Sequence, residues 1–170
     1  MFNNHKRDII TKELLYHLFE YNKSAGLLIW KNAPKHNSQL TGLRAGTIVL
    51  GYRSIKIKGL QFKEHHLIWF IETGAFPKYE LDHINGLRDD NRYENLRDIS
   101  KELNQQNQRS ARVDNKTGFL GVSKKNGKFY AQISSKRLDK KFSLGYFDTA
   151  EEAHLVYLEK KREIHEGCTI

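Results

Sequence analysis

The chain has one cysteine, Cys168, among its 170 residues. A single thiol cannot form a disulfide within the chain, and it cannot supply the paired thiolates of a cysteine-based zinc site. We therefore expect no structural zinc. Any metal bound by this protein would be held by oxygen and imidazole ligands.

Long apolar segments are also missing. No run approaches the roughly 20 apolar residues that a membrane-spanning helix needs. The opening stretch, MFNNHKRDIITKELL, has neither the apolar core nor the cleavage site of a signal peptide. These absences predict a cytoplasmic protein with no membrane partner. Hydrophobic residues still make up 38% of the chain, enough for modest cores in one ordinary domain or two small ones.

Positive charge is unevenly distributed along the chain. The net charge is +9 overall, yet residues 109–146 alone hold ten basic and two acidic residues, a net charge of +8. Residues 147–170 hold three basic and six acidic residues. A local basic patch is typical of a protein that binds a polyanion. The alternative interpretation is a basic surface that serves only solubility.

The hydropathy pattern predicts an α+β protein with a small β-rich region near its start. The expected elements are a helix over 9–20, strands over Leu27–Trp30, Thr47–Leu50 and Tyr52–Lys58, a loop over 32–46 and a helix over Glu64–Glu72. Gly74 is expected to cap the second helix.

The last third of the chain favours a three-stranded sheet followed by a helix. Strands are expected over Leu120–Ser123, Phe129–Ser134 and Lys141–Gly145, with Asn126-Gly127 as a hairpin turn. A helix is expected over about 150–165, and Thr149 with Glu152 would form its capping box.

Leu81–Gln108 concentrates polar side chains that suit phosphodiester hydrolysis. This reaction needs a base that activates water and a cation that neutralises charge on the phosphate. Asp82 offers a hard oxygen ligand for Mg²⁺, and His83 has a side chain that titrates near neutrality. Ser100 is a plausible N-cap for a helix over Lys101–Gln108. In that helix, the amide of Asn104 could complete a two-ligand metal site.

These residues resemble the HNH endonucleases of the ββα-metal fold, particularly the phage-type group that includes intron-encoded nickases. The matching stretches are HHLIW, TG-F-P, LDHINGLRDDNRYENLR and LNQQNQ. The resemblance implies that Asp82 and Asn104 bind the metal and that His83 is the general base. It implies that Asn95 is a catalytic residue that braces the loop without touching metal. Asn104 stands where other branches of the family have histidine.

Several nearby residues have plainer interpretations. Asp89, Asp90 and Asn91 are read as loop or turn residues, and His65 and His66 as packing residues of an apolar helix. Asn107 is ambiguous and could contact a phosphate from its helix face. Upstream, a DNA-contacting β-ribbon is a hypothesis that rests on four basic residues: Arg44, Arg53, Lys56 and Lys58.

Residues 117–166 resemble an AP2 DNA-binding domain, a three-stranded sheet plus helix best known from plant transcription factors. The matching stretches are GVSKKNGKFYAQI and SLGYFDTAEEAHLVY. The predicted DNA-binding residues are Lys124, Lys125, Lys128, Tyr130, Gln132, Lys136, Arg137, Lys140 and Lys141. Ser123, Lys125, Tyr130, Gln132 and Ser134 are expected to face the DNA. Plant domains carry arginines where this chain has Ser123, Lys125 and Gln132, so their sequence preference does not transfer.

Together these features predict a metal-dependent endonuclease acting on double-stranded DNA, of the phage homing-endonuclease or nickase type, in a bacterial host. One Mg²⁺ is expected, with Mn²⁺ possible. The predicted organisation is an N-terminal region (1–61), an HNH module (62–108), a linker (109–116) and an AP2-like domain (117–168). The oligomeric state stays open, with a monomer favoured. The alternative function is a non-catalytic, sequence-specific DNA-binding protein; an RNA-binding protein is a weaker third.

Overall fold

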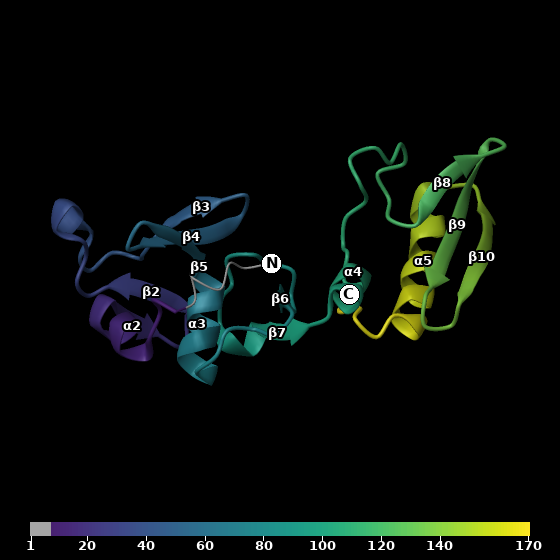
Figure 1. Ribbon diagram of the computed structural model, residues 1–170. Helices are drawn as coiled ribbons and strands as arrows, with labels where there is room; N and C mark the ends of the chain where they lie inside the picture. The colour runs from purple at the N-terminus through teal and green to yellow at the C-terminus, as the bar shows by residue number, and fades with distance from the viewer. Residues whose placement is uncertain (1–7) are drawn as a thin grey trace. The chain divides into compact units, whose positions relative to one another are not determined.

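A computed structural model describes residues 8–170 of the chain. Residues 1–7 lie outside the described part, and they are the beginning of the N-terminal stretch that lacks the apolar core of a signal peptide. The fold is α+β, with short helices and small antiparallel sheets (Figure 1). The chain divides into two compact units, Met1–Ile99 and Ser100–Ile170, and each is described by itself.

The first unit begins with helix α2 (Lys12–Leu18), which is shorter than the predicted helix over 9–20. Its last predicted turn is instead strand β1 (Phe19–Asn22), paired with β2 (Leu27–Trp30). Phe19 lies opposite Trp30 in this hairpin, and their rings pack with centroids 4.6 Å apart. Cross-strand packing of two aromatic side chains therefore overrides the helical periodicity of this segment.

A three-stranded sheet follows the short 3₁₀ helix η1 (Lys35–Leu40). Its strands are β3 (Thr47–Val49), β4 (Tyr52–Ile57) and β5 (Leu60–Lys63). Sequence analysis missed β5, which begins directly after a tight turn at Lys58 and Gly59. Both turn residues have positive φ angles, 47° and 82°, which suits a two-residue hairpin connection.

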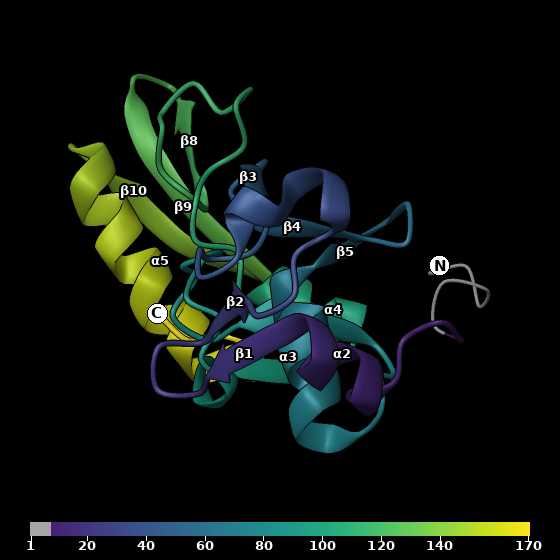
Figure 2. The same ribbon diagram turned by 90° about the vertical axis from the view of Figure 1, so that its left-hand side faces the viewer.

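Helix α3 (Glu64–Thr73) follows β5 directly, so that its first residues lie at the predicted site, and it ends at Gly74, which has the left-handed conformation expected of a C-cap. Around it, α2, the β1–β2 hairpin and β4 build one core (Figure 2). Leu15, Leu28, Ile55 and Leu67 are completely buried there. The β-rich N-terminal region and α3 thus share a single core, which fixes the start of α3.

The predicted site residues of this unit lie on or next to two short strands. β6 (Glu80–His83) pairs with β7 (Leu96–Ile99), so that Asp82 lies opposite Arg97 and His83 opposite Leu96. The connection between them passes through Gly86, whose φ is 77°, and ends in the 3₁₀ helix η2 (Tyr93–Asn95).

The second unit opens with helix α4 (Lys101–Gln106), which Ser100 caps as predicted by accepting a hydrogen bond from the amide of Leu103. Strands β8 (Val122–Lys125), β9 (Lys128–Ser135) and β10 (Lys140–Phe147) form a sheet with β9 in the middle. Helix α5 (Ala150–Ile164) begins with the predicted Thr149–Glu152 capping box.

Helix α5 lies along one face of this sheet (Figure 1). Val122, Ala131, Ala150 and Ala153 are buried between sheet and helix. Gly121 is needed here because a β-carbon at this position would lie 2.0 Å from the ring of Tyr157. Nothing in residues 8–170 forms a helix long and apolar enough to cross a bilayer.

Candidate active site

His83 ends β6 and is buried, with 4% of its surface exposed. Its Nε2 atom lies 2.9 Å from the side-chain oxygen of Asn91. Asn91 is completely buried, and its amide nitrogen donates to a carboxylate oxygen of Glu64 at 2.8 Å. The carboxylate can only accept, so the oxygen of Asn91 must face His83.

This orientation determines the tautomer of His83. The amide oxygen of Asn91 accepts, so Nε2 of His83 carries the proton and donates it to Asn91. The other ring nitrogen, Nδ1, then keeps its lone pair. Within residues 8–170, Nδ1 has no hydrogen-bond partner, and it is not among the fully buried polar atoms. The geometry therefore leaves one nitrogen of the ring able to accept a proton.

Glu64 anchors this arrangement at the first residue of α3, where it is completely buried. One of its oxygens accepts from the backbone amide of Leu28 at 2.8 Å. The other accepts from Arg44 at 2.7 Å as well as from Asn91. A buried carboxylate with this many donors satisfies the rule that buried charges are paired and hydrogen-bonded.

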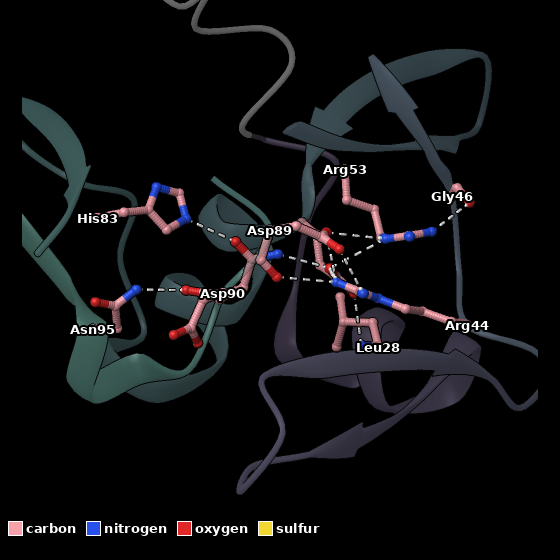
Figure 3. A network of polar contacts seen from close by, with 10 residues as sticks. Leu28, Arg44, Gly46, Arg53, His83, Asp89, Asp90 and Asn95 are labelled. Carbon is pink, nitrogen blue, oxygen red and sulfur yellow. Dashed lines mark hydrogen bonds and ion pairs between the residues drawn. The ribbon is translucent and has the colours of Figure 1, made fainter. Parts of the chain in front are cut away.

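Two arginines and a second carboxylate complete the network (Figure 3). Arg44 donates to both carboxylate oxygens of Asp89, at 2.9 and 2.8 Å, and Arg53 lies 3.3 Å from the same group. Burial lowers the pKa of Arg44, but the hydrogen bond and charge of Glu64 more than offset this and raise it. The two cations and two anions thus balance each other in a network that runs from the completely buried Glu64 to the partly exposed Asp89.

Aromatic and imidazole rings surround His83. The ring of His65 packs edge-on with centroids 4.8 Å apart, and Tyr52 lies 6.1 Å away. Burial lowers the pKa of His83 below its ordinary value, although the hydrogen bond to Asn91 opposes this. Burial also lowers the pKa of His65. Both rings are therefore neutral at pH 7, and neutral His83 is the form that accepts a proton.

Asp82 precedes His83 and lies next to Arg97 on the neighbouring strand. Two nitrogens of Arg97 donate to one carboxylate oxygen of Asp82, at 3.0 and 2.9 Å. Both side chains are partly buried. This ion pair holds the carboxylate in one orientation.

Asn95 lies at the end of the loop that connects β6 to β7, and its side chain holds this loop closed. Its side-chain oxygen accepts from the amide of Asn85 at 2.9 Å. Its side-chain nitrogen donates to the side chain of Asn85 at 3.0 Å and to the carbonyl of Asp90 at 2.8 Å. These contacts agree with a bracing role, since they tie both halves of the loop to the start of β7.

The loop is further fixed by charge. Arg92 binds Asp90 through two nitrogens, at 2.8 and 2.7 Å. This hydrogen bonding, with a further bond from Asn85, lowers the pKa of Asp90 to about 2. Gly26 of the β1–β2 turn packs so closely on this loop that a β-carbon would lie 2.2 Å from the amide nitrogen of Arg92. The N-terminal hairpin therefore sets the position of Asn91.

Asn104, the fourth predicted residue, belongs to α4 in the second unit. It is partly buried, and its amide donates to the carbonyl of Ser100 as part of the helix. The structure thus brings together Asp82, His83 and Asn95 in one unit and describes Asn104 in the other.

The donor set fits a hard divalent cation. Asp82 offers a carboxylate oxygen and Asn104 an amide oxygen, the ligand types that Mg²⁺ accepts together with water and phosphate. No group of three or more histidine, cysteine, aspartate or glutamate side chains within residues 8–170 is arranged to hold a metal.

One face of the second unit's sheet collects the residues predicted to meet DNA. Ala131 and Ile133 of β9 are buried towards α5, so the residues between them point to the opposite face. The strand registers extend this face, which consists of Ser123, Lys125, Lys128, Tyr130, Gln132, Ser134, Lys141, Ser143 and Tyr146. We call it the open sheet face.

Tyr146 belongs to the open sheet face, although sequence analysis did not predict it as a DNA-binding residue. It lies opposite Tyr130, their ring centroids are 4.9 Å apart, and it is 49% exposed. The ammonium of Lys125 lies 5.6 Å from the ring of Tyr130. The open sheet face thus combines exposed aromatic rings with positive charge.

The remaining predicted DNA-binding residues lie elsewhere in this unit. Lys124 pairs with Phe129 and Lys140 with Ser135, which places both on the helix side of the sheet. Lys136 and Arg137 occupy the turn between β9 and β10, where Arg137 forms an ion pair with Glu166 at 3.1 Å. These four could reach a backbone phosphate only from the edges of the sheet.

Comparison with known proteins identifies one segment. Residues 62–106 match the model of a family described as HNH endonuclease. The match supports an HNH endonuclease domain. The segment, called the HNH segment below, contains Glu64, Asp82, His83, Asn95 and Asn104, and its family supports phosphodiester hydrolysis on DNA. No curated protein and no solved structure matches the chain.

Sequence analysis missed the residues that support His83. Asn91 was read only as a loop or turn residue; it does lie in the loop between β6 and β7, but its complete burial and its bond to His83 give it a supporting role that this interpretation left out. Glu64 was read only as part of a helix. The hypothesis of a DNA-contacting β-ribbon also relied on Arg44 and Arg53. Both form ion pairs within the first unit, Arg44 with Glu64 and Arg53 with Asp89. A charged residue at the start of an otherwise apolar helix was the one available signal for Glu64.

Proposed function

We propose that this protein is a metal-dependent endonuclease that hydrolyses phosphodiester bonds in duplex DNA, of the phage homing-endonuclease or nickase type. The observation that carries the proposal is the hydrogen-bonded chain from His83 through Asn91 to Glu64, inside a segment that matches HNH endonucleases. A neutral histidine with one tautomer and one available nitrogen is what a general base requires.

In the proposed mechanism, Nδ1 of His83 takes a proton from a water molecule, and that water attacks the phosphorus in line with the leaving 3′ oxygen. Asn91 stabilises the imidazolium that forms, because its oxygen continues to accept the Nε2 proton. Asn95 keeps the loop closed around both residues. The leaving 3′ oxygen takes a proton from solvent, and His83 later releases its proton to solvent, so the products are a 5′-phosphate and a 3′-hydroxyl.

Asp82 and Asn104 would hold the divalent cation, Mg²⁺ or Mn²⁺. When bound, the cation neutralises charge on the phosphate and on the leaving oxygen. Arg97 keeps Asp82 oriented for this task through its two hydrogen bonds. With one such site per chain, a monomer would nick one strand, and a double-strand break would need a dimer or two successive cuts.

Binding to duplex DNA is assigned to the open sheet face, as a module similar to an AP2 domain. A sheet can lie in the major groove with alternate residues towards the base edges. We assign base contacts to Tyr130 and Gln132 and phosphate contacts to Lys125, Lys128 and Lys141, because the strand registers put all five on this face. The proposed organisation remains a nuclease module over 62–108 and a DNA-binding domain over 117–168.

A plasmid-nicking assay with Mg²⁺ and with Mn²⁺ tests the proposal. We expect the wild-type chain to nick DNA, and His83→Ala to cut about 10²- to 10⁴-fold more slowly, the usual contribution of a general base. His83→Gln serves as a second variant, because its amide can still bond to Asn91. DNA binding should stay within about two-fold in both, since the open sheet face is unchanged.

His36→Ala is the matched control, because it removes an exposed histidine of η1. It should cut and bind like the wild type. A wild-type chain that binds duplex DNA but nicks with neither metal would favour the alternative function, a non-catalytic DNA-binding protein. Full cleavage by both His83 variants would refute the base assignment.

A further inference from the structure

Helix α4 carries Asn104 but has only six residues. A helix this short is not stable by itself in water, so it depends on contacts with other parts of the chain. Within the second unit, those contacts come from the segment that follows α5. We call Gly167–Thr169 the bracing segment.

The bracing segment binds the end of α4 through three hydrogen bonds. The amide of Gly167 donates to the side-chain oxygen of Gln106 at 3.0 Å. Thr169 donates to the side-chain oxygen of Asn107 twice, from its backbone amide at 3.2 Å and from its hydroxyl at 2.6 Å. Asn107 is 7% exposed and forms the C-cap of α4. It is therefore a structural residue and not an exposed contact for phosphate.

Close packing and a buried cation strengthen this contact. A β-carbon on Gly167 would lie 2.1 Å from the carbonyl oxygen of Leu103, in the middle of α4. Lys161 of α5 is 1% exposed, and its ammonium donates to the carbonyl of Gln108. Burial lowers the pKa of Lys161. Arg109 in turn donates to the hydroxyl of Thr169 at 2.7 Å.

We propose that the bracing segment positions α4 and, through it, the metal ligand Asn104. This inference rests on the proposed function and adds to it a group of residues that influence the metal site. It assigns to Thr169, Asn107 and Gly167, which are remote in sequence from the catalytic cluster, control over metal affinity.

The test combines two measurements on the full chain. Amide hydrogen exchange of residues 104–107, without metal or DNA, reports the stability of α4. Mn²⁺ affinity of the protein–DNA complex, from the electron paramagnetic resonance signal of free Mn²⁺, reports the metal site without using cleavage. The variants are Thr169→Val, which removes only the hydroxyl, and Gly167→Ala, which forces the segment away from Leu103.

We expect Thr169→Val to speed exchange at residues 104–107 and to weaken Mn²⁺ binding, by about two- to ten-fold for each of the two hydrogen bonds that the hydroxyl forms with Asn107 and Arg109. Gly167→Ala should have a larger effect. Thr169→Ser should restore wild-type behaviour, because it retains the hydroxyl. Thr41→Val, the same change at an exposed threonine of the first unit, should alter neither measurement.

Each negative result has a separate meaning. Unchanged exchange in both bracing variants would show that the segment does not hold α4. Faster exchange with unchanged Mn²⁺ affinity would show that it stabilises the helix but does not position a metal ligand. Either outcome overturns the inference. A wild-type chain that binds Mn²⁺ and yet fails to cut DNA would refute the proposed function alone.

Discussion

The two units differ in the surroundings of several basic residues. In the first unit, Arg44, Arg53 and Arg97 are mostly buried, and each forms an ion pair with a carboxylate. In the second, Lys124, Lys125, Lys140 and Lys141 are exposed, and none of them forms an ion pair with a carboxylate of residues 8–170. Counting charges along the chain therefore overstates what the first unit offers to DNA.

The difference teaches that a cation's surroundings decide its role. An arginine enclosed between two carboxylates has exchanged its hydration for fixed partners, and its removal leaves a buried anion unpaired. An exposed lysine keeps its hydration and counterions, which it can release to a phosphate backbone. The first unit thus uses charge to hold the His83 site, and the second offers charge to a polyanion.

The largest expected effect comes from breaking the buried cluster. Glu64→Ala removes the acceptor of Leu28, Arg44 and Asn91, and it leaves the interior with an excess of positive charge. We expect the free energy of unfolding to fall by about 3–5 kcal/mol. Denaturant unfolding measured by fluorescence would check this.

Glu94→Ala is the control for this change. Glu94 pairs with Arg92 on the surface, and its side chain is 75% exposed. Its loss should change the stability by no more than about 0.5 kcal/mol, as is usual for an exposed ion pair. Equal effects of the two substitutions would mean that the buried cluster has no special structural role.

An intermediate effect is expected from the open sheet face. Replacing Lys125 and Lys141 with alanine should leave stability within about 0.5 kcal/mol, because both side chains are exposed. DNA affinity should fall, and the slope of log affinity against log salt should decrease by about two, since two phosphate contacts are lost. Titrations over a range of salt concentrations would measure this.

The matched control replaces Lys23 and Lys31, two exposed lysines of the first unit. The change in net charge is the same, so a general electrostatic effect would appear in both pairs. A salt slope that decreases equally for both would contradict the assignment of DNA binding to the open sheet face.

The smallest expected effect is on the pH dependence of the cleavage rate, which should be shifted to lower pH than for a histidine with an ordinary pKa. Cleavage needs neutral His83, whose pKa burial lowers below its ordinary value of 6.5. The rate should therefore rise with pH, reach half its maximum below pH 6.5 and be level above it. Single-turnover rates between pH 5 and 8 would show this. A midpoint at or above 6.5 in the wild type would contradict a buried base, and His36→Ala should leave the profile unchanged.

Much of the fold was predictable from local patterns. The positions of α3 and α5 and the Thr149 capping box were all confirmed, because caps and apolar periodicity act over a few residues. The predicted helix over 9–20 was wrong where β1 begins, and β5 was missed, since these strands are stabilised by partners that local propensity does not include. The residue types of the catalytic cluster were visible for the same local reason.

What the sequence alone determined is the chemistry on offer: an Asp82-His83 pair in the HNH segment, a stretch of high positive charge, and no thiolate pair for zinc. Only the tertiary structure decided which of these side chains are already bound to other groups of the protein. It enclosed Arg44 beside Glu64, and it turned the amide of Asn91 so that His83 has one tautomer. The reason is that Glu64 meets Leu28, Arg44 and Asn91 only after the chain folds back on itself, and the spacing of residues along a chain does not specify such contacts.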